Sequence, residues 1–130
     1  MVINRQVCQC LALLILGAAA FGVEAEIQSL KCVYPKYSDS KGLHKAKNPM
    51  VFSSIIDTKT NKVYMTGNVS SVEVTPIPNG VSGNSFIETT PVGNVTVTTV
   101  MANGESVHSR SMVYPDGILA SQYYGTCVAN

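Results

Sequence analysis

The sequence predicts an all-β protein: a single antiparallel up-and-down meander of about eight strands, closed into a barrel. After residue 26 the chain consists of short runs rich in Val, Ile, Thr, Tyr and Phe, which Gly, Pro, Asn and Asp separate. No stretch of this region repeats its apolar residues with the 3.6-residue period of a helix. Turn sequences between the runs favour hairpins, and a cysteine near each end favours closure of the meander. A β-sandwich is the alternative architecture.

Residues 1–25 have the features of a secretory signal peptide. Arg5 supplies a positive charge, residues 7–23 carry no charged side chain, and Val23-Glu24-Ala25 suits a cleavage site. The apolar centre is shorter than the roughly 20 residues that a membrane-spanning helix needs. We therefore expect a periplasmic or secreted protein with no stable membrane insertion after cleavage, and a single β domain over residues 26–130.

Cleavage leaves two cysteines, Cys32 and Cys127, in a compartment that favours oxidation. We expect one disulfide bond, which ties the first strand to the last and contributes about 2–4 kcal/mol by restricting the unfolded chain. Neither cysteine has a histidine close by in sequence, so the pattern predicts no metal site and no cofactor. Asn68 and Asn94 begin acceptor sequences for N-glycosylation, which matter only in a eukaryotic secretory route.

The expected strands follow from the alternation of β-favouring runs and turn residues. The segment 35–49, which is polar and rich in lysine, is expected to be a loop between the first two strands. We expect the strands at residues 27–34, 50–57, 62–67, 69–77, 84–90, 94–101, 106–114 and 118–127.

Two turns fix the expected register of the last three strands. Asn103-Gly104 favours a two-residue hairpin, whose central residues both take positive φ. Residues 114–117, Tyr-Pro-Asp-Gly, fit a type I turn that ends in a glycine bulge. These turns predict two cross-strand rows on one face: Thr99, His108 and Tyr124, and Val97, Arg110 and Gln122.

A third hairpin is expected at residues 66–69. Its register places Lys62 opposite Glu73. The polar side chains of the two strands then share one face, and the other face gathers four apolar side chains: Val63, Met65, Val72 and Val74.

Composition and charge exclude several classes of function. A formal net charge of +1 and a charged fraction of 13% leave no basic excess for neutralising nucleic-acid phosphates. Beyond the signal peptide the chain has two histidines and one arginine, and it has no nucleophile or phosphate-loop motif. We therefore expect a protein that is not an enzyme and binds no nucleic acid.

Four side chains form the candidate site for a ligand or partner: His108, Arg110, Gln122 and Tyr124. The predicted rows place these groups together on an otherwise apolar face, where they are either solvated, paired within the protein or available for binding. The planar guanidinium of Arg110 suits a carboxylate or phosphate, and Glu88 is a candidate partner within the protein. We expect a non-catalytic binding protein for an unknown small molecule or protein. The alternatives are an inhibitor of a hydrolase and a small enzyme that uses His108.

The C-terminal run Ser121-Gln122-Tyr123-Tyr124-Gly125-Thr126-Cys127 resembles the C-terminal signature of a family of small secreted β-proteins from proteobacteria. The resemblance covers residues 50–127 and implies an exported bacterial protein, without implying an activity. The overall plan is also similar to that of periplasmic lysozyme inhibitors, which have eight-stranded barrels. This second resemblance implies the inhibitor alternative.

Overall fold

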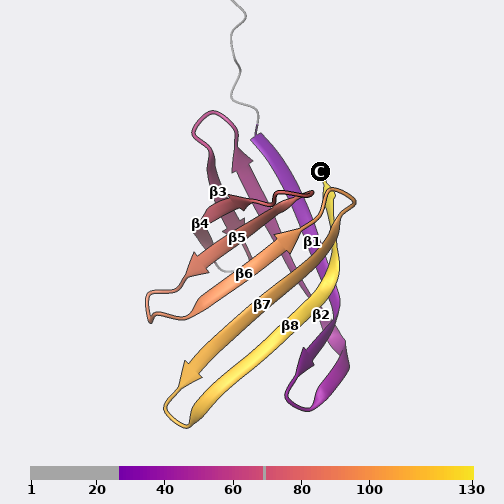
Figure 1. Cartoon of the computed structure of the whole chain (residues 1–130), viewed down its shortest axis with the longest axis vertical. Coiled ribbons are helices and arrows are strands. Elements are labelled where there is room, and N and C mark those ends of the chain that lie inside the picture. Colours follow the sequence, from indigo (N-terminus) through magenta and orange to yellow (C-terminus); the bar gives the residue numbers. More distant parts are fainter. Residues whose placement is uncertain (1–26, 69) are drawn as a thin grey trace, which may run out of the picture.

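The computed structural model describes residues 27–68 and 70–130, which form a closed barrel of eight antiparallel strands. Each strand pairs with the next in sequence, and β8 returns to pair with β1 (Figure 1). The strands are β1 (Ile27–Asp39), β2 (Gly42–Asp57), β3 (Lys62–Thr66), β4 (Ser71–Pro78), β5 (Asn84–Thr89), β6 (Val95–Val100), β7 (Glu105–Tyr114) and β8 (Gly117–Ala129). The prediction of a barrel is therefore confirmed. The expected signal peptide lies outside the described residues.

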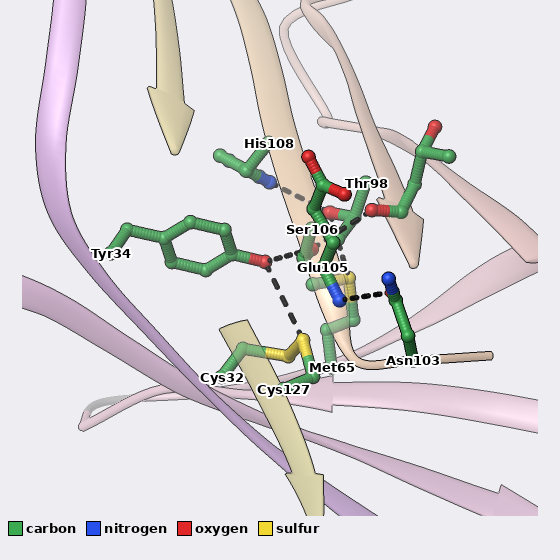
Figure 2. The surroundings of a disulfide bond; sticks show 10 residues. Cys32, Tyr34, Met65, Thr98, Asn103, Glu105, Ser106, His108 and Cys127 are labelled. Carbon is green, nitrogen blue, oxygen red and sulfur yellow. Dashed lines mark hydrogen bonds between the residues drawn. A yellow bond between two sulfur atoms is a disulfide. The ribbon is translucent and has the colours of Figure 1, made fainter. Parts of the chain in front are cut away.

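The barrel closes where the two cysteines meet. Cys32 of β1 lies directly opposite Cys127 of β8, and the two form the expected disulfide bond. Both side chains are buried, and Tyr34 packs beside them with its hydroxyl 2.8 Å from Ser106 Oγ (Figure 2). Gly125 allows β8 to approach β1 closely here, because a Cβ atom at this position would collide with the carbonyl oxygen of Val33.

The prediction of a loop over residues 35–49 is wrong. β1 continues to Asp39 and β2 begins at Gly42, so that a short turn replaces the loop. The register shifts between Tyr34 and Lys36, and this irregularity carries the chain past Pro35 into a further stretch of paired strand. The lysines do not prevent pairing, because those of the segment lie on exposed positions of a hairpin whose inward positions hold Tyr37 and His44.

The turn between β6 and β7 differs from the expected two-residue hairpin. Met101 and Glu105 close the turn, with the Met101 amide 2.8 Å from the Glu105 carbonyl oxygen, so that three residues lie between them. Gly104 takes a positive φ of 91°, whereas Asn103 does not take a positive φ. This is the three-residue hairpin in which only the glycine is left-handed. Its register places Thr98, instead of Thr99, opposite His108.

The register between β7 and β8 also differs by one residue from the prediction. Tyr123 lies opposite His108, and Ser121 lies opposite Arg110. Because side chains alternate along a strand, this shift moves Gln122 and Tyr124 to the other face of β8. The two predicted cross-strand rows are therefore wrong in their β6 and β8 members.

The hairpin of β3 and β4 is shifted by two residues. Tyr64, and not Lys62, lies opposite Glu73, although the Lys62 ammonium still lies 3.7 Å from the Glu73 carboxylate. A shift of two residues keeps every side chain on its expected face. The predicted apolar face is accordingly found inside the barrel, with Val63 and Val74 buried opposite each other.

Packed side chains fill the middle of the barrel. Tyr34, Phe52 and His108 meet there, with ring centroids 5.2 Å apart for Tyr34–Phe52 and for Phe52–His108. The buried apolar side chains around them are Cys32, Val63, Met65, Val74, Phe86, Val100 and Cys127. The two ends of the barrel are therefore separated by a solid core.

Candidate functional site

His108 lies at the polar edge of this core. Its Nδ1 atom is 2.7 Å from Thr98 Oγ1, and its ring contacts the rings of Phe52 and Tyr123. Burial, and secondarily the charge of Arg110, lowers the pKa of the imidazole from 6.5 to about 4. The side chain is therefore neutral at neutral pH, and it acts as a packed core residue with one short hydrogen bond.

Arg110 follows His108 on the same face of β7 and is half-buried. Its Nε atom donates to Ser121 Oγ at 3.1 Å, and one terminal nitrogen donates to the Tyr123 hydroxyl at 2.7 Å. The guanidinium carbon also lies 4.9 Å from the centre of the Tyr123 ring. Every one of these partners is uncharged, so the guanidinium is held in place without a counter-charge.

Glu88, the candidate partner of Arg110, lies in the same cross-strand row but does not pair with it. Thr96 lies between them, opposite both residues, and donates to Glu88 Oε2 at 3.3 Å. Within residues 27–68 and 70–130, ion pairs closer than 4.0 Å join His44 to Asp39 and Lys62 to Glu73, and none involves Arg110.

Gln122 and Tyr124 form a separate pair on the outer face of β8. The Tyr124 hydroxyl donates to Gln122 Oε1 at 3.0 Å and lies 2.9 Å from Ser38 Oγ. A solvent-open hollow of about 490 Å³ crosses this region, and Gln122 and Arg110 both line it. The structure thus places Gln122 and Tyr124 on the outer face of β8, the Arg110 side chain on the inner face of β7, and His108 in the core.

A different site lies at the opposite end of the barrel, where β1 begins and β8 ends (Figure 1). Two hollows of about 430 and 270 Å³ open there, and they share Ile56, Asn84 and Phe86 in their walls. We call the joint basin the apolar mouth. Its residues are Gln28, Leu30, Ile56, Asn61, Val63, Pro76, Pro78, Gly83, Asn84, Phe86, Val100, Met101, Ala102, Asn103, Gly104, Cys127 and Ala129.

Among the residues that the structure describes, those that line the apolar mouth include no ionisable side chain. Its floor includes Phe86 and Val100, both buried, and one half of the disulfide. Its polar side chains are amides, contributed by four separate segments: Gln28, Asn61, Asn84 and Asn103. An apolar concavity with a few convergent polar groups, and a volume of roughly 300–1,000 Å³, is typical of a small-molecule site.

The side chains of His108 and Ser106 are engaged within the core. His108 contacts a hydroxyl and aromatic rings, and the hydroxyl of Ser106 is engaged by Tyr34 and by the Thr99 carbonyl oxygen. The described part of the chain holds no group of three or more His, Cys, Asp or Glu side chains that could bind a metal. It also holds no helix long and apolar enough to span a membrane.

Sequence reasoning missed the apolar mouth. Its residues come from the starts and ends of strands that are far apart in the chain, and several of them lie in turns. Charged residues stand at the same strand ends, Asp57, Lys62 and Glu105 among them, so the uncharged lining becomes visible only when the closed order of the strands and the inward positions are known. No family model, no curated protein and no solved structure matches this chain.

Proposed function

We propose that this protein is a non-catalytic binding protein of the periplasm or the extracellular space, and that its ligand is a small, uncharged, mainly apolar molecule held in the apolar mouth. The observation that supports it most directly is a hollow of about 430 Å³ that shares three wall residues with a second of about 270 Å³. Among the described residues, those that line the two hollows form an apolar floor and include no ionisable side chain. Such a basin removes apolar surface of a ligand from water at a gain of roughly 25 cal/mol per Å².

The absence of charge determines the class of ligand. An ionised group seated on Phe86 and Val100 would lose its hydration and find no opposite charge, which is strongly unfavourable. The amides of Asn84 and Asn103 can donate and accept hydrogen bonds at the rim. They therefore suit a hydroxyl, carbonyl or amide group at one end of an otherwise apolar ligand.

The packed core limits the size of the ligand. Tyr34, Phe52 and His108 fill the section of the barrel beneath the mouth, so that a ligand cannot continue along the axis. A molecule of about the volume of the mouth fits, whereas a long acyl chain would project into solvent. Export is supported by the signal-peptide features of residues 1–25 and by the disulfide, which suits an oxidising compartment.

Binding of N-phenyl-1-naphthylamine, an uncharged apolar dye, tests the proposal by fluorescence titration. The matched variants are Ala129→Trp, which fills the mouth, and Val128→Trp, which places the same side chain on an exposed outer position of the same strand. We expect saturable binding to the wild-type protein, an at least tenfold weaker affinity for Ala129→Trp, and an unchanged affinity for Val128→Trp. Equal binding to both variants contradicts the proposal.

A second pair of variants tests the role of charge. Asn84→Asp introduces a carboxylate into the wall shared by both hollows, whereas Asn79→Asp introduces one on an exposed neighbouring turn. We expect about a tenfold loss of dye affinity for Asn84→Asp and none for Asn79→Asp. Sedimentation analysis completes the test. A wild-type dimer that Ala129→Trp dissociates would show that a second copy, and not a small ligand, occupies the mouth.

A further inference from the structure

We infer that two neighbouring hairpins, at the end of the barrel opposite the apolar mouth, form a docking surface for an anionic phospholipid bilayer. One is the end of the β7–β8 hairpin, residues 112–119, which we call the apolar tip. The other is the β1–β2 hairpin over residues 36–47, which we call the basic hairpin. Both end at the lower end of Figure 1, and β1 pairs with β8 between them. Neither shares a residue with the apolar mouth, so the inference does not depend on the proposed function.

The apolar tip extends beyond the strands that flank it. Pairing of β7 with β6 ends at Ser111, and pairing of β8 with β1 ends at Gln122. In the described part of the chain, residues 112–119 form strand pairs only with each other, as far as Tyr114 opposite Gly117. A two-stranded hairpin by itself is at best marginally stable in water. A surface that covers the tip therefore stabilises it.

The apolar tip exposes apolar side chains on both of its faces. Val113 and Ile118 lie opposite each other on the outer face and are 65% and 72% exposed. Tyr114 and Leu119, on the face that continues the barrel interior, are also exposed. Exposed apolar surface of this kind marks a contact with a protein or a membrane. A bilayer fits best, because lipid covers both faces of an inserted tip at once and tyrosine favours the level of the headgroups.

The length of the apolar tip suits the interfacial layer of a bilayer. Three residues in each strand, at about 3.4 Å each, make a tip roughly 10 Å long. Segments that lie in a membrane interface bury their apolar side chains by about 5–10 Å. The charged side chain of the tip, Asp116 in its turn, favours hydration and limits the depth. The tip therefore enters one leaflet and is too short to cross a hydrocarbon core of about 30 Å.

The basic hairpin supplies the complementary charge. Lys36 and Lys45 lie directly opposite each other, which is unfavourable for two like charges. Among the residues that the structure describes, no carboxylate lies within 4.0 Å of any lysine of this hairpin. An anionic bilayer surface attracts each nearby lysine and relieves this repulsion. The exposed lysines of the hairpin are Lys36, Lys41, Lys45 and Lys47.

Tryptophan fluorescence tests the inference at a single position, because the chain contains no tryptophan. Ile118→Trp places the reporter on the apolar tip, and Val128→Trp places it on an exposed position at the other end of the same strand. The proteins are recovered from the periplasm of a bacterial host and mixed with vesicles of phosphatidylcholine and phosphatidylglycerol in equal amounts. We expect a saturable blue shift of the emission for Ile118→Trp and none for Val128→Trp. Binding to vesicles of phosphatidylcholine alone should be at least tenfold weaker.

Paired charge variants, made in the Ile118→Trp protein, test the basic hairpin. Lys41→Gln together with Lys45→Gln should weaken vesicle binding at least tenfold, because each lysine near the surface adds to the attraction. Lys31→Gln together with Lys59→Gln removes the same charge from exposed positions near the apolar mouth and should leave the affinity nearly unchanged. Circular dichroism identical to that of the wild-type protein shows that each variant is folded.

Several results would overturn the inference: no blue shift for Ile118→Trp, equal shifts at the two tryptophan positions, equal binding to the two kinds of vesicle, or equal weakening by the two pairs of lysine substitutions. Sedimentation of the wild-type protein tests the other occupant. A dimer that Val113→Ser together with Ile118→Ser dissociates would assign the apolar tip to a second copy of the chain and would also overturn the inference.

Discussion

Acidification should destabilise the barrel through His108. This side chain is 7% exposed and packs against three aromatic rings, and its pKa falls from 6.5 to about 4 on folding because of burial first and the Arg110 charge second. Between these two pH values the unfolded chain binds a proton that the folded chain does not bind. The contribution of neutral His108 to the free energy of unfolding is therefore fully present above about pH 6.5, and it is lost as the pH falls towards 4.

The size of the effect follows from the two pKa values. Each pKa unit corresponds to about 1.4 kcal/mol, so the fall from 6.5 to about 4 corresponds to about 3 kcal/mol of stability lost once the pH is below both values. Most of the loss, about 2.5 kcal/mol, should be reached by pH 4.5. That is a large share of the 5–15 kcal/mol that is typical of a whole domain.

Urea unfolding between pH 7 and pH 4.5 measures this loss and stays above the range in which the lowered carboxyl pKa values of Asp39 and Asp57 matter. His108→Gln, which cannot titrate, should have a lower stability at pH 7 and a nearly flat pH dependence. His44→Gln removes the other histidine of the barrel. The stability of this variant should still fall between pH 7 and pH 4.5 by most of the amount seen in the wild-type protein. A wild-type stability that is constant over this range, or an equal slope in His108→Gln, would refute the reasoning.

Four other predictions concern the fold and the exposure of particular side chains. Reducing the Cys32–Cys127 bond should lower the free energy of unfolding by about 2–4 kcal/mol, measured by urea unfolding with and without reductant; an unchanged midpoint contradicts a structural bond. Burial raises the pKa of Tyr34 to about 12, so the ultraviolet absorbance of the six tyrosines should show one that ionises last, and the stability that its neutral form provides should be lost between about pH 10 and 12. The Asn94 side chain is buried and accepts a hydrogen bond at 2.9 Å from a β7 backbone amide, so Asn94→Ala should cost about 1–3 kcal/mol. In a eukaryotic secretory host, Asn68 should carry glycan and Asn94 should not, because Asn68 is exposed; mass spectrometry of the product checks both.

The strand order was predictable because it depends on features that are local in sequence. Each turn signal joins two neighbouring strands, and the positions of Cys32 and Cys127 imply that the last strand returns to the first. Polar composition misled the prediction only over residues 35–49. An exposed hairpin can carry lysines on its outer positions, and composition alone does not distinguish such a hairpin from a loop.

The candidate site was less predictable, because it depends on register. The shift of two residues at β3–β4 left every side chain on its expected face. The shifts of one residue on either side of β7 moved side chains of the neighbouring strands to the opposite face. Gln122 and Tyr124 were thereby separated from His108 and Arg110. An Asn-Gly sequence is compatible with two-residue and three-residue hairpins, so the turn sequence does not determine the register of the strands to within one residue.

The central claim is that the apolar mouth binds an uncharged ligand, and NMR mapping of N-phenyl-1-naphthylamine on ¹⁵N-labelled protein tests it most directly. We predict saturable shifts of the backbone amides of Asn84, Val100 and Asn103, which line the mouth, and unchanged signals for Ser109 and Ser111 at the other end of the barrel. Shifts that are absent, that do not saturate, or that concentrate at Ser109 and Ser111 would contradict the claim.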